Sequence, residues 1–263
     1  MRRQTSILSC MVLIVASAFV SCSKKEEPGV GSTDPGEVEG SVGSVSFTYR
    51  AKPVTYATVR AKDGNIWLQQ NLGATKVASS LSDADAYGDF FQWGRWDDGH
   101  QVRNPAPPIA PASSLTANNP SGLTKSGNSP YIANWWIDGA SNDQWTTRTP
   151  AETTPTVSCD PCRAVGENWR MPSPTEWNAL LQAESITNSV TAFASTLKIP
   201  TSGWRATFDT SILGEGWDSW FWTRQAGNEG YALGVWIRSG SVLKDYNDLR
   251  AYGTSVRCVK KQE

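Results

Sequence analysis

The sequence has 263 residues and a formal net charge of −1, with 13 Trp, five Cys and a single His. It contains no basic run or stripe, which argues against nucleic acid as a partner. The chain is long enough to bury a sizeable core, and its many large rings predict that this core is aromatic.

The N-terminus is typical of a bacterial lipoprotein signal peptide. Arg2 and Arg3 precede an apolar segment, Ile7–Val20, that is too short to span a bilayer. Phe19–Cys22 resembles a lipobox, which implies cleavage before Cys22 and diacylglycerol on its sulfur. Because acyl chains hold a protein on a membrane without a transmembrane helix, we expect membrane contact through this anchor only. The alternatives are a plain secretory signal with an incidental cysteine and an uncleaved anchor.

The sequence after Cys22 predicts a flexible tether. It is rich in Gly, Ser and acidic residues, with too little apolar surface to offset chain entropy. Within it, Ser23–Glu27 resembles the surface-export signal of Bacteroidetes lipoproteins, which implies the cell-surface side of the outer membrane. A periplasm-facing anchor is the alternative. The expected organisation is a signal peptide over 1–21, an anchor and tether over 22–44, and one domain over 45–263.

Short strands separated by turns dominate the first part of the domain. Val54–Arg60 alternates apolar and polar residues, and a turn at Lys62–Asn65 leads into Ile66–Leu68, which predicts a hairpin. Phe90–Trp93 is a short apolar run that predicts another strand. The stretch from there to Cys159 is rich in Pro, Asn, Ser and Gly, and a loop of that length is usually functional or partly disordered.

Two helices are expected after this loop. Ser173–Glu176 has the sequence of a capping box with Pro at the first helical position, and apolar residues then follow at helical spacing in Trp177–Leu181. A second helix is expected over Ser189–Thr196. The remaining sequence is spaced like an antiparallel meander, with strands expected over Trp220–Thr223, Tyr231–Ile237, Ser241–Tyr246 and Thr254–Val259. Because helices and strands do not alternate, we predict an α+β domain of short antiparallel strands, one or two helices and long loops.

Five segments in chain order resemble the Fibrobacter succinogenes major paralogous domain. They are Ile66–Leu72 (IWLQQNL), Gly88–Arg95 (GDFFQWGR), Cys162 followed by Asn168–Trp177 (NWRMPSPTEW), Trp220–Thr223 (WFWT) and Ser255–Val259 (SVRCV). The resemblance covers nearly all of the domain and implies a C-type-lectin-like fold, shared distantly with the formylglycine-generating enzymes. It implies little about activity, because most members have no assigned function and a fold does not determine a function.

The sequence departs from this pattern in two places. Residues 163–168 lengthen the usual gap between the cysteine and Trp169. Calcium-dependent lectins use characteristic tripeptides, and only Tyr246–Asp248 partly matches one of them. We interpret this segment as a turn after a strand. Calcium-mediated sugar binding is therefore not expected. The sequence also lacks a glycine-rich phosphate loop and a second Cys or His pair that would complete a zinc site, so no cofactor or metal is predicted.

Three cysteines remain after Cys22, namely Cys159, Cys162 and Cys258. An oxidising compartment permits a disulfide, and three pairings are open. Cys159–Cys162 spells a C-x-x-C motif, which is typical of redox or metal sites, but no thioredoxin-like βαβ pattern surrounds it. We therefore favour a structural disulfide with one spare thiol. The family resemblance implies that Cys162 pairs with Cys258.

Candidate catalytic residues are few. His100 follows Asp97 and Asp98 in a polar turn, and we interpret it as an exposed loop residue because no serine has a nucleophile-elbow context. Asp83 and Asp85 are expected to cap a turn. A carboxylate pair for glycoside hydrolysis stays open among Glu152, Glu176, Glu184, Glu215 and Asp218, although helix capping already explains Glu176. We expect a protein that is not an enzyme.

The long loop offers a candidate ligand surface. Its aromatic residues Trp135, Trp136 and Trp145 lie among polar residues that include Asp138, Asn142 and Asp143. Indole faces stack on sugars while such polar groups take the hydroxyls, although the rings could instead plug the core. The predicted function is a surface-displayed, non-catalytic binding or adhesion module for a glycan or a cell-surface protein. The alternatives are a structural envelope or fimbria-associated component and an enzyme related to formylglycine generation.

Overall fold

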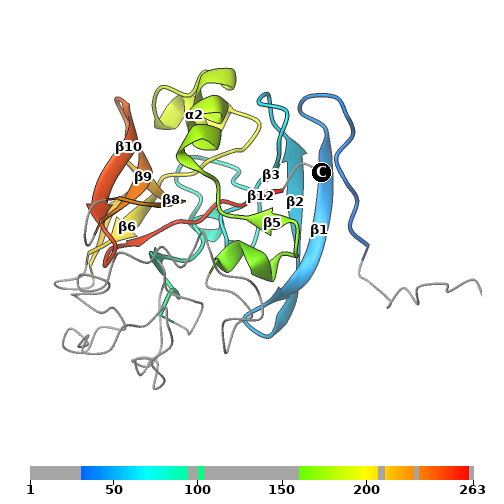
Figure 1. Ribbon diagram of the computed structural model, residues 1–263, viewed down its shortest axis with the longest axis horizontal. Coiled ribbons are helices and arrows are strands. Elements are labelled where there is room, and N and C mark those ends of the chain that lie inside the picture. The colour runs from blue at the N-terminus through cyan, green and yellow to red at the C-terminus, as the bar shows by residue number, and fades with distance from the viewer. Residues whose placement is uncertain (1–30, 94–99, 104–159, 207–210, 228–230, 261–263) are drawn as a thin grey trace, which may run out of the picture.

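The computed structural model describes residues 31–93, 100–103, 160–206, 211–227 and 231–260 (Figure 1). Cys22, Cys159 and the six predicted ligand residues of the long loop lie outside these ranges, so the expectations about them stay predictions. Within the described ranges, no helix is long and apolar enough to cross a membrane.

The described strands form two sheets, which Figure 1 shows at opposite ends of the view. The first has the order β1-β2-β3-β12-β5, and all its pairs are antiparallel. Its strands are β1 (Val42–Tyr49), β2 (Lys52–Arg60), β3 (Ile66–Leu68), β12 (Val259–Lys260) and β5 (Trp169–Arg170). The predicted hairpin is confirmed, because β2 and β3 pair with Val59 opposite Trp67.

The second sheet has the order β10-β9-β8-β6-β11-β4, with β7 paired to β6. Its strands are β10 (Val242–Leu249), β9 (Tyr231–Ile237), β8 (Ser219–Ala226), β6 (Ser202–Arg205), β11 (Gly253–Thr254), β4 (Phe91–Gln92) and β7 (Ile212–Glu215). The pairing is antiparallel except between β6 and β8. The β8-β9-β10 meander was predicted, whereas β6 and β7 were not.

Two α-helices, α2 (Pro174–Ala183) and α3 (Ser189–Ala194), accompany the sheets. Both begin with a capping box, formed by Ser173 with Glu176 in α2 and by Asn188 with Thr191 in α3. These reciprocal bonds satisfy amide groups that the first turn of a helix leaves unpaired. The mostly antiparallel sheets with two helices agree with the predicted α+β class.

The predicted disulfide joins Cys162 to Cys258, which are 96 residues apart in the sequence. Cys162 lies in a short 3₁₀ helix, η3 (Pro161–Ala164), and Cys258 lies just before β12. Next to it, the Arg257 guanidinium is fully buried and donates to Asn71 Oδ1 and to the carbonyls of Leu68 and Leu197. The C-terminal segment is therefore tied into the fold by one covalent bond and a set of charge-assisted hydrogen bonds.

The folded region begins before the predicted boundary at Val45. β1 starts at Val42, and Thr33 forms a bridge with Ser44. The two segments lie so close that a Cβ on Gly43 would sit 2.1 Å from the Thr33 carbonyl oxygen. Farther out, Lys260 Nζ pairs with Asp34 at 2.7 Å. The predicted tether boundary therefore falls inside the first strand, because glycine lets the incoming chain pack directly on it.

Candidate functional site

The second sheet has two faces with different surroundings. On one face, Phe221 from β8 and Val235 from β9 pack with Trp177 and Leu180 of α2 in a buried cluster. The rings of Trp177 and Phe221 lie 5.1 Å apart. Because side chains alternate along a strand, Trp220 and its cross-strand partner Trp236 lie on the opposite face. The helix therefore anchors the sheet and leaves the tryptophan side directed away from it.

We call this second side the aromatic face and define it by five rings: Trp204, Trp220, Trp236, Tyr246 and Tyr252. Trp220 and Trp236 are stacked at 5.3 Å with an interplanar angle of 10°. Tyr246 lies 5.5 Å from each of these two rings. Trp204 lies 5.6 Å from Trp220 and 4.9 Å from Tyr252. Trp220 is fully buried as the floor, and the other four rings are half-buried around it.

Strand register aligns these side chains across the sheet. Trp220 stands opposite Trp236, and Trp236 stands opposite Leu243 of β10. On the other side, Trp204 of β6 stands opposite Leu213 of β7, whose side chain is 36% exposed. With neighbouring strands about 4.8 Å apart, a row across five strands spans about 19 Å. The arrangement is therefore an elongated apolar strip rather than a single aromatic pocket.

Two backbone features shape this strip. A Cβ on Gly234 would lie 2.7 Å from Trp220 Nε1 and 2.8 Å from the Phe221 carbonyl oxygen, so only glycine lets the Trp220 ring lie flat on β9. The register of β10 shifts between Leu243 and Tyr246, where Asp245 has a φ of +51°. Such bulges redirect side chains, and this one returns Tyr246 to the aromatic face.

The indole N–H groups of Trp220 and Trp236 are buried, and neither has an acceptor among the described residues. An unsatisfied buried donor costs about 1–3 kcal/mol. Other indoles in the described fold do find acceptors, such as Trp93 with the Thr223 carbonyl and Trp222 with the Phe91 carbonyl. The aromatic face thus retains polar atoms at some cost in stability, which is common at functional sites.

Asp248 places a carboxylate on the same side of β10. It follows Tyr246 by two residues, so the two side chains share a face. It accepts a hydrogen bond from the amide of Leu249 at 2.7 Å. Burial raises its pKa to about 6, against the effect of that hydrogen bond. Burial also raises the pKa of Tyr252, and the charges of Asp248, Tyr231 and Tyr246 raise it further.

This arrangement corrects the interpretation of Tyr246–Asp248 as a turn after a strand. The segment lies inside β10, paired with Ala232, Leu233 and Gly234 of β9. The strand continues because the β-bulge at Asp245 accommodates a shift in register, after which β10 pairs with β9 again from Tyr246 onward.

His100 also differs from its expected place on an exposed loop. Its side chain is fully buried, and its Nε2 accepts the amide of Gln92 at 3.1 Å. The ring packs edge-on against Phe91 at 6.2 Å. The buried amide needs an acceptor, and the histidine supplies one. Asp97 and Asp98, its candidate orienting residues, lie outside the described residues.

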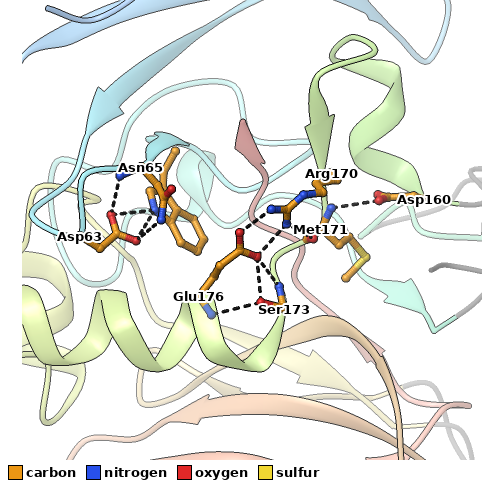
Figure 2. A network of polar contacts seen from close by, with 8 residues as sticks. Asp63, Asn65, Asp160, Arg170, Met171, Ser173 and Glu176 are labelled. Atoms are coloured by element: carbon orange, nitrogen blue, oxygen red, sulfur yellow. Dashed lines mark hydrogen bonds and ion pairs between the residues drawn. The ribbon is translucent and has the colours of Figure 1, made fainter. Parts of the chain in front are cut away.

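The carboxylates proposed for hydrolysis serve the fold. Figure 2 shows Glu176 facing Arg170, with Ser173 at the start of α2. Burial raises the pKa of Glu176, but the hydrogen bonds from Arg170 and Ser173 outweigh it and lower the pKa overall. Glu184 accepts the Lys62 amide, and Glu215 pairs with Arg103 at 2.9 Å.

The other acidic candidates either take part in turns or lie outside the described residues. Asp83 accepts the amide and hydroxyl of Ser79, which fits the expected turn. Asp218 closes the turn after β7 through its amide, which donates to the Gly214 carbonyl. Glu152 lies outside the described residues. No group of three or more His, Cys, Asp or Glu side chains that could hold a metal is found among the described residues.

A separate pocket of about 380 Å³ lies beside the tip of the β1-β2 hairpin. Tyr49 and Tyr56 line it, with Arg50 and Lys52 at its edge. Tyr49 donates to the buried carboxylate of Asp89 at 2.9 Å, and Tyr56 accepts the amide of Gly73. These polar atoms are used to join the hairpin to the neighbouring loop, so the pocket presents fewer groups for a ligand than the aromatic face does.

The predicted ligand residues Trp135, Trp136, Asp138, Asn142, Asp143 and Trp145 lie outside the described residues. The aromatic face was missed as a site. The alternation of Trp220 and Trp222 was a signal for a shared face, but the sequence held no signal for the approach of Trp204 from β6 and of Tyr252 from the turn before β11. Comparison of the chain with protein-family models, curated proteins and solved structures found no match.

Proposed function

We propose that this chain is a lipid-anchored, surface-displayed binding module that recognises a glycan through its aromatic face. The observation that carries the proposal is the set of packed rings across the second sheet, four of them half-buried around the buried Trp220. An indole plane offers a large apolar surface at little conformational cost, and it complements the C–H face of a pyranose ring. A strip rather than a closed pocket suits several sugar units in line.

Polar groups at the border of the strip would orient the sugar. Asp248 follows Tyr246 on β10, and the Arg238 guanidinium lies over the Trp236 ring, 4.7 Å from its centre. Binding sites commonly combine a mainly apolar surface with a few polar groups of this kind. The proposal includes no catalysis, because His100, Glu176 and Glu215 are engaged in holding the fold.

The rest of the fold is suited to holding the aromatic face in place for a ligand. The α2 helix supports the strip from behind, and the paired sheets and the Cys162–Cys258 disulfide stabilise the domain. They are compatible with the C-type-lectin-like fold that the family resemblance implies, which we retain as part of the proposal. A lipid on Cys22 and the tether after it would place the strip at the cell surface, facing glycans outside.

The test is glycan-array binding of the full chain in detergent, followed by calorimetry on the best ligand. Trp236→Ala should weaken binding by about 30-fold, the factor that corresponds to about 2 kcal/mol for a central aromatic anchor. Trp236→Phe, which keeps an aromatic plane, should recover part of the affinity. Trp217→Ala is the matched control, because Trp217 is 70% exposed and is not one of the five rings of the aromatic face. Equal binding by all three variants would refute the role of the aromatic face.

A further inference from the structure

The Asp248 carboxylate differs from two other acidic groups near the second sheet, Glu215 and Glu176. Glu215 pairs with Arg103 at 2.9 Å, and Glu176 pairs with Arg170. Asp248 is half-buried, and no ion pair joins it to a cationic side chain of the described residues. Its one hydrogen bond comes from the adjacent amide of Leu249.

An unpaired carboxylate in this position is unfavourable for the free protein. Burial removes water from the charge, and no cation among the described residues compensates for that loss. The carboxylate is nevertheless mostly ionised at neutral pH, because its pKa of about 6 lies below 7. A cation brought by a ligand would provide the missing partner.

The surroundings favour an organic ammonium group over a metal ion. Tyr246 precedes Asp248 by two residues on one face of β10, about 7 Å away, and the side chain of Tyr252 is close enough to interact with its charge. Aromatic rings attract organic cations, whereas calcium needs six to eight oxygen ligands. No such group of ligands is found among the described residues.

Strand pairing connects the carboxylate to the rings of the aromatic face. Ala232 stands opposite Asp248, and Gly234 stands opposite Tyr246. From Asp248 the same face continues through Tyr246 to Trp236, whose ring lies 5.5 Å from that of Tyr246. A ligand that stacks on these rings therefore reaches the carboxylate without leaving the face.

We infer that the glycan bound by the aromatic face carries a protonated amine, as in an amino sugar, which pairs with Asp248 while adjacent sugar rings stack on Trp236 and Tyr246. This inference rests on the proposed glycan-binding function. It goes further in naming the chemical class of the ligand and the residue that selects it.

Three tetrasaccharides with the same β-1,4 backbone provide the test: cellotetraose, tetra-N-acetylchitotetraose and its fully deacetylated form. They differ at the 2-position, which carries a hydroxyl, an acetamide or an amine. We expect the full chain, at about pH 6.5 where Asp248 is mostly ionised and the amine is largely protonated, to bind the deacetylated form about tenfold more tightly than the other two.

Two variants separate this inference from the proposed function. Asp248→Asn keeps the acceptor for the Leu249 amide and should remove the tenfold preference for the deacetylated form. Asp245→Asn removes an exposed charge from the same strand and should keep the preference. Equal affinity for the three sugars, or a preference that survives Asp248→Asn, would overturn the inference but not glycan binding. Absence of binding to any glycan would overturn both.

Discussion

Replacing Asp248 by Asn should stabilise the protein at neutral pH. Folding moves the pKa of Asp248 from 3.8 to about 6, mainly through burial, so the folded state disfavours its charge. Near pH 3 and below the side chain is mostly protonated in both the folded and the unfolded states, and its shift has little effect on stability. Above about pH 6 it is ionised in both, and the folded state bears the whole penalty of the buried charge.

The size of the effect follows from this shift. Two pKa units correspond to about 3 kcal/mol, but solvent reaches part of the side chain and reduces the penalty to about 1 kcal/mol. Asparagine keeps the shape and the acceptor for the Leu249 amide while removing the charge. Asp160, whose pKa burial also raises to about 6, is present in both proteins and cancels in the comparison.

Urea unfolding of the parent and of Asp248→Asn between about pH 3 and pH 8 measures the difference. The two free energies of unfolding should coincide near pH 3, separate as the pH rises from about 4 to about 6, and then run parallel, with the variant more stable by about 1 kcal/mol. A variant that is less stable at pH 7, or a difference that does not change with pH, would refute the reasoning. The expected gain also fits a carboxylate kept for binding, because functional groups often lower stability.

Three further predictions concern the site, the disulfide and the anchor. Gly234→Ala should destabilise the protein by about 1–3 kcal/mol and weaken glycan binding, because the added Cβ would meet the Trp220 ring. Gly240→Ala is the control, and it should change thermal stability little because the space around Gly240 is open. Replacing Cys162 and Cys258 by Ser should lower the free energy of unfolding by at most about 4–5 kcal/mol, since the bond closes a long loop; an unchanged urea midpoint would contradict this. Cys22→Ser should abolish palmitate labelling and release the protein from the membrane fraction, whereas unchanged labelling would exclude lipidation at this residue.

Elements whose signals lie within a few neighbouring residues were predicted correctly from the sequence. The capping box of α2 and the Asp63–Asn65 turn between β2 and β3 require residues only a few positions apart. The strand β9 was predicted with its observed limits, because its alternation and flanking turns are visible in the sequence. The disulfide was predicted from the family resemblance, since the three cysteines allowed three pairings.

Elements held by distant partners were harder to predict. β6 and β7 contain glycine and few apolar residues, and their pairing depends on register with β8 and β11. His100 was expected to be exposed because its sequence neighbours are polar. In the fold its side chain is fully buried and accepts a hydrogen bond from the Gln92 amide. Tyr246–Asp248 resembled a turn because only the pairing with β9 reveals that β10 continues through the bulge.

The sequence by itself therefore determined the class of the domain, the capped helix, the hairpin and the aromatic character of the core, because these follow from periodicity and composition. Only the tertiary structure decided that Trp204, Trp220, Trp236, Tyr246 and Tyr252 form one surface. Alternation shows which side chains of one strand share a face, but it does not show which face α2 covers or which rings from other strands join it. Those choices depend on strand register and on the docking of α2, which are properties of the whole packed chain.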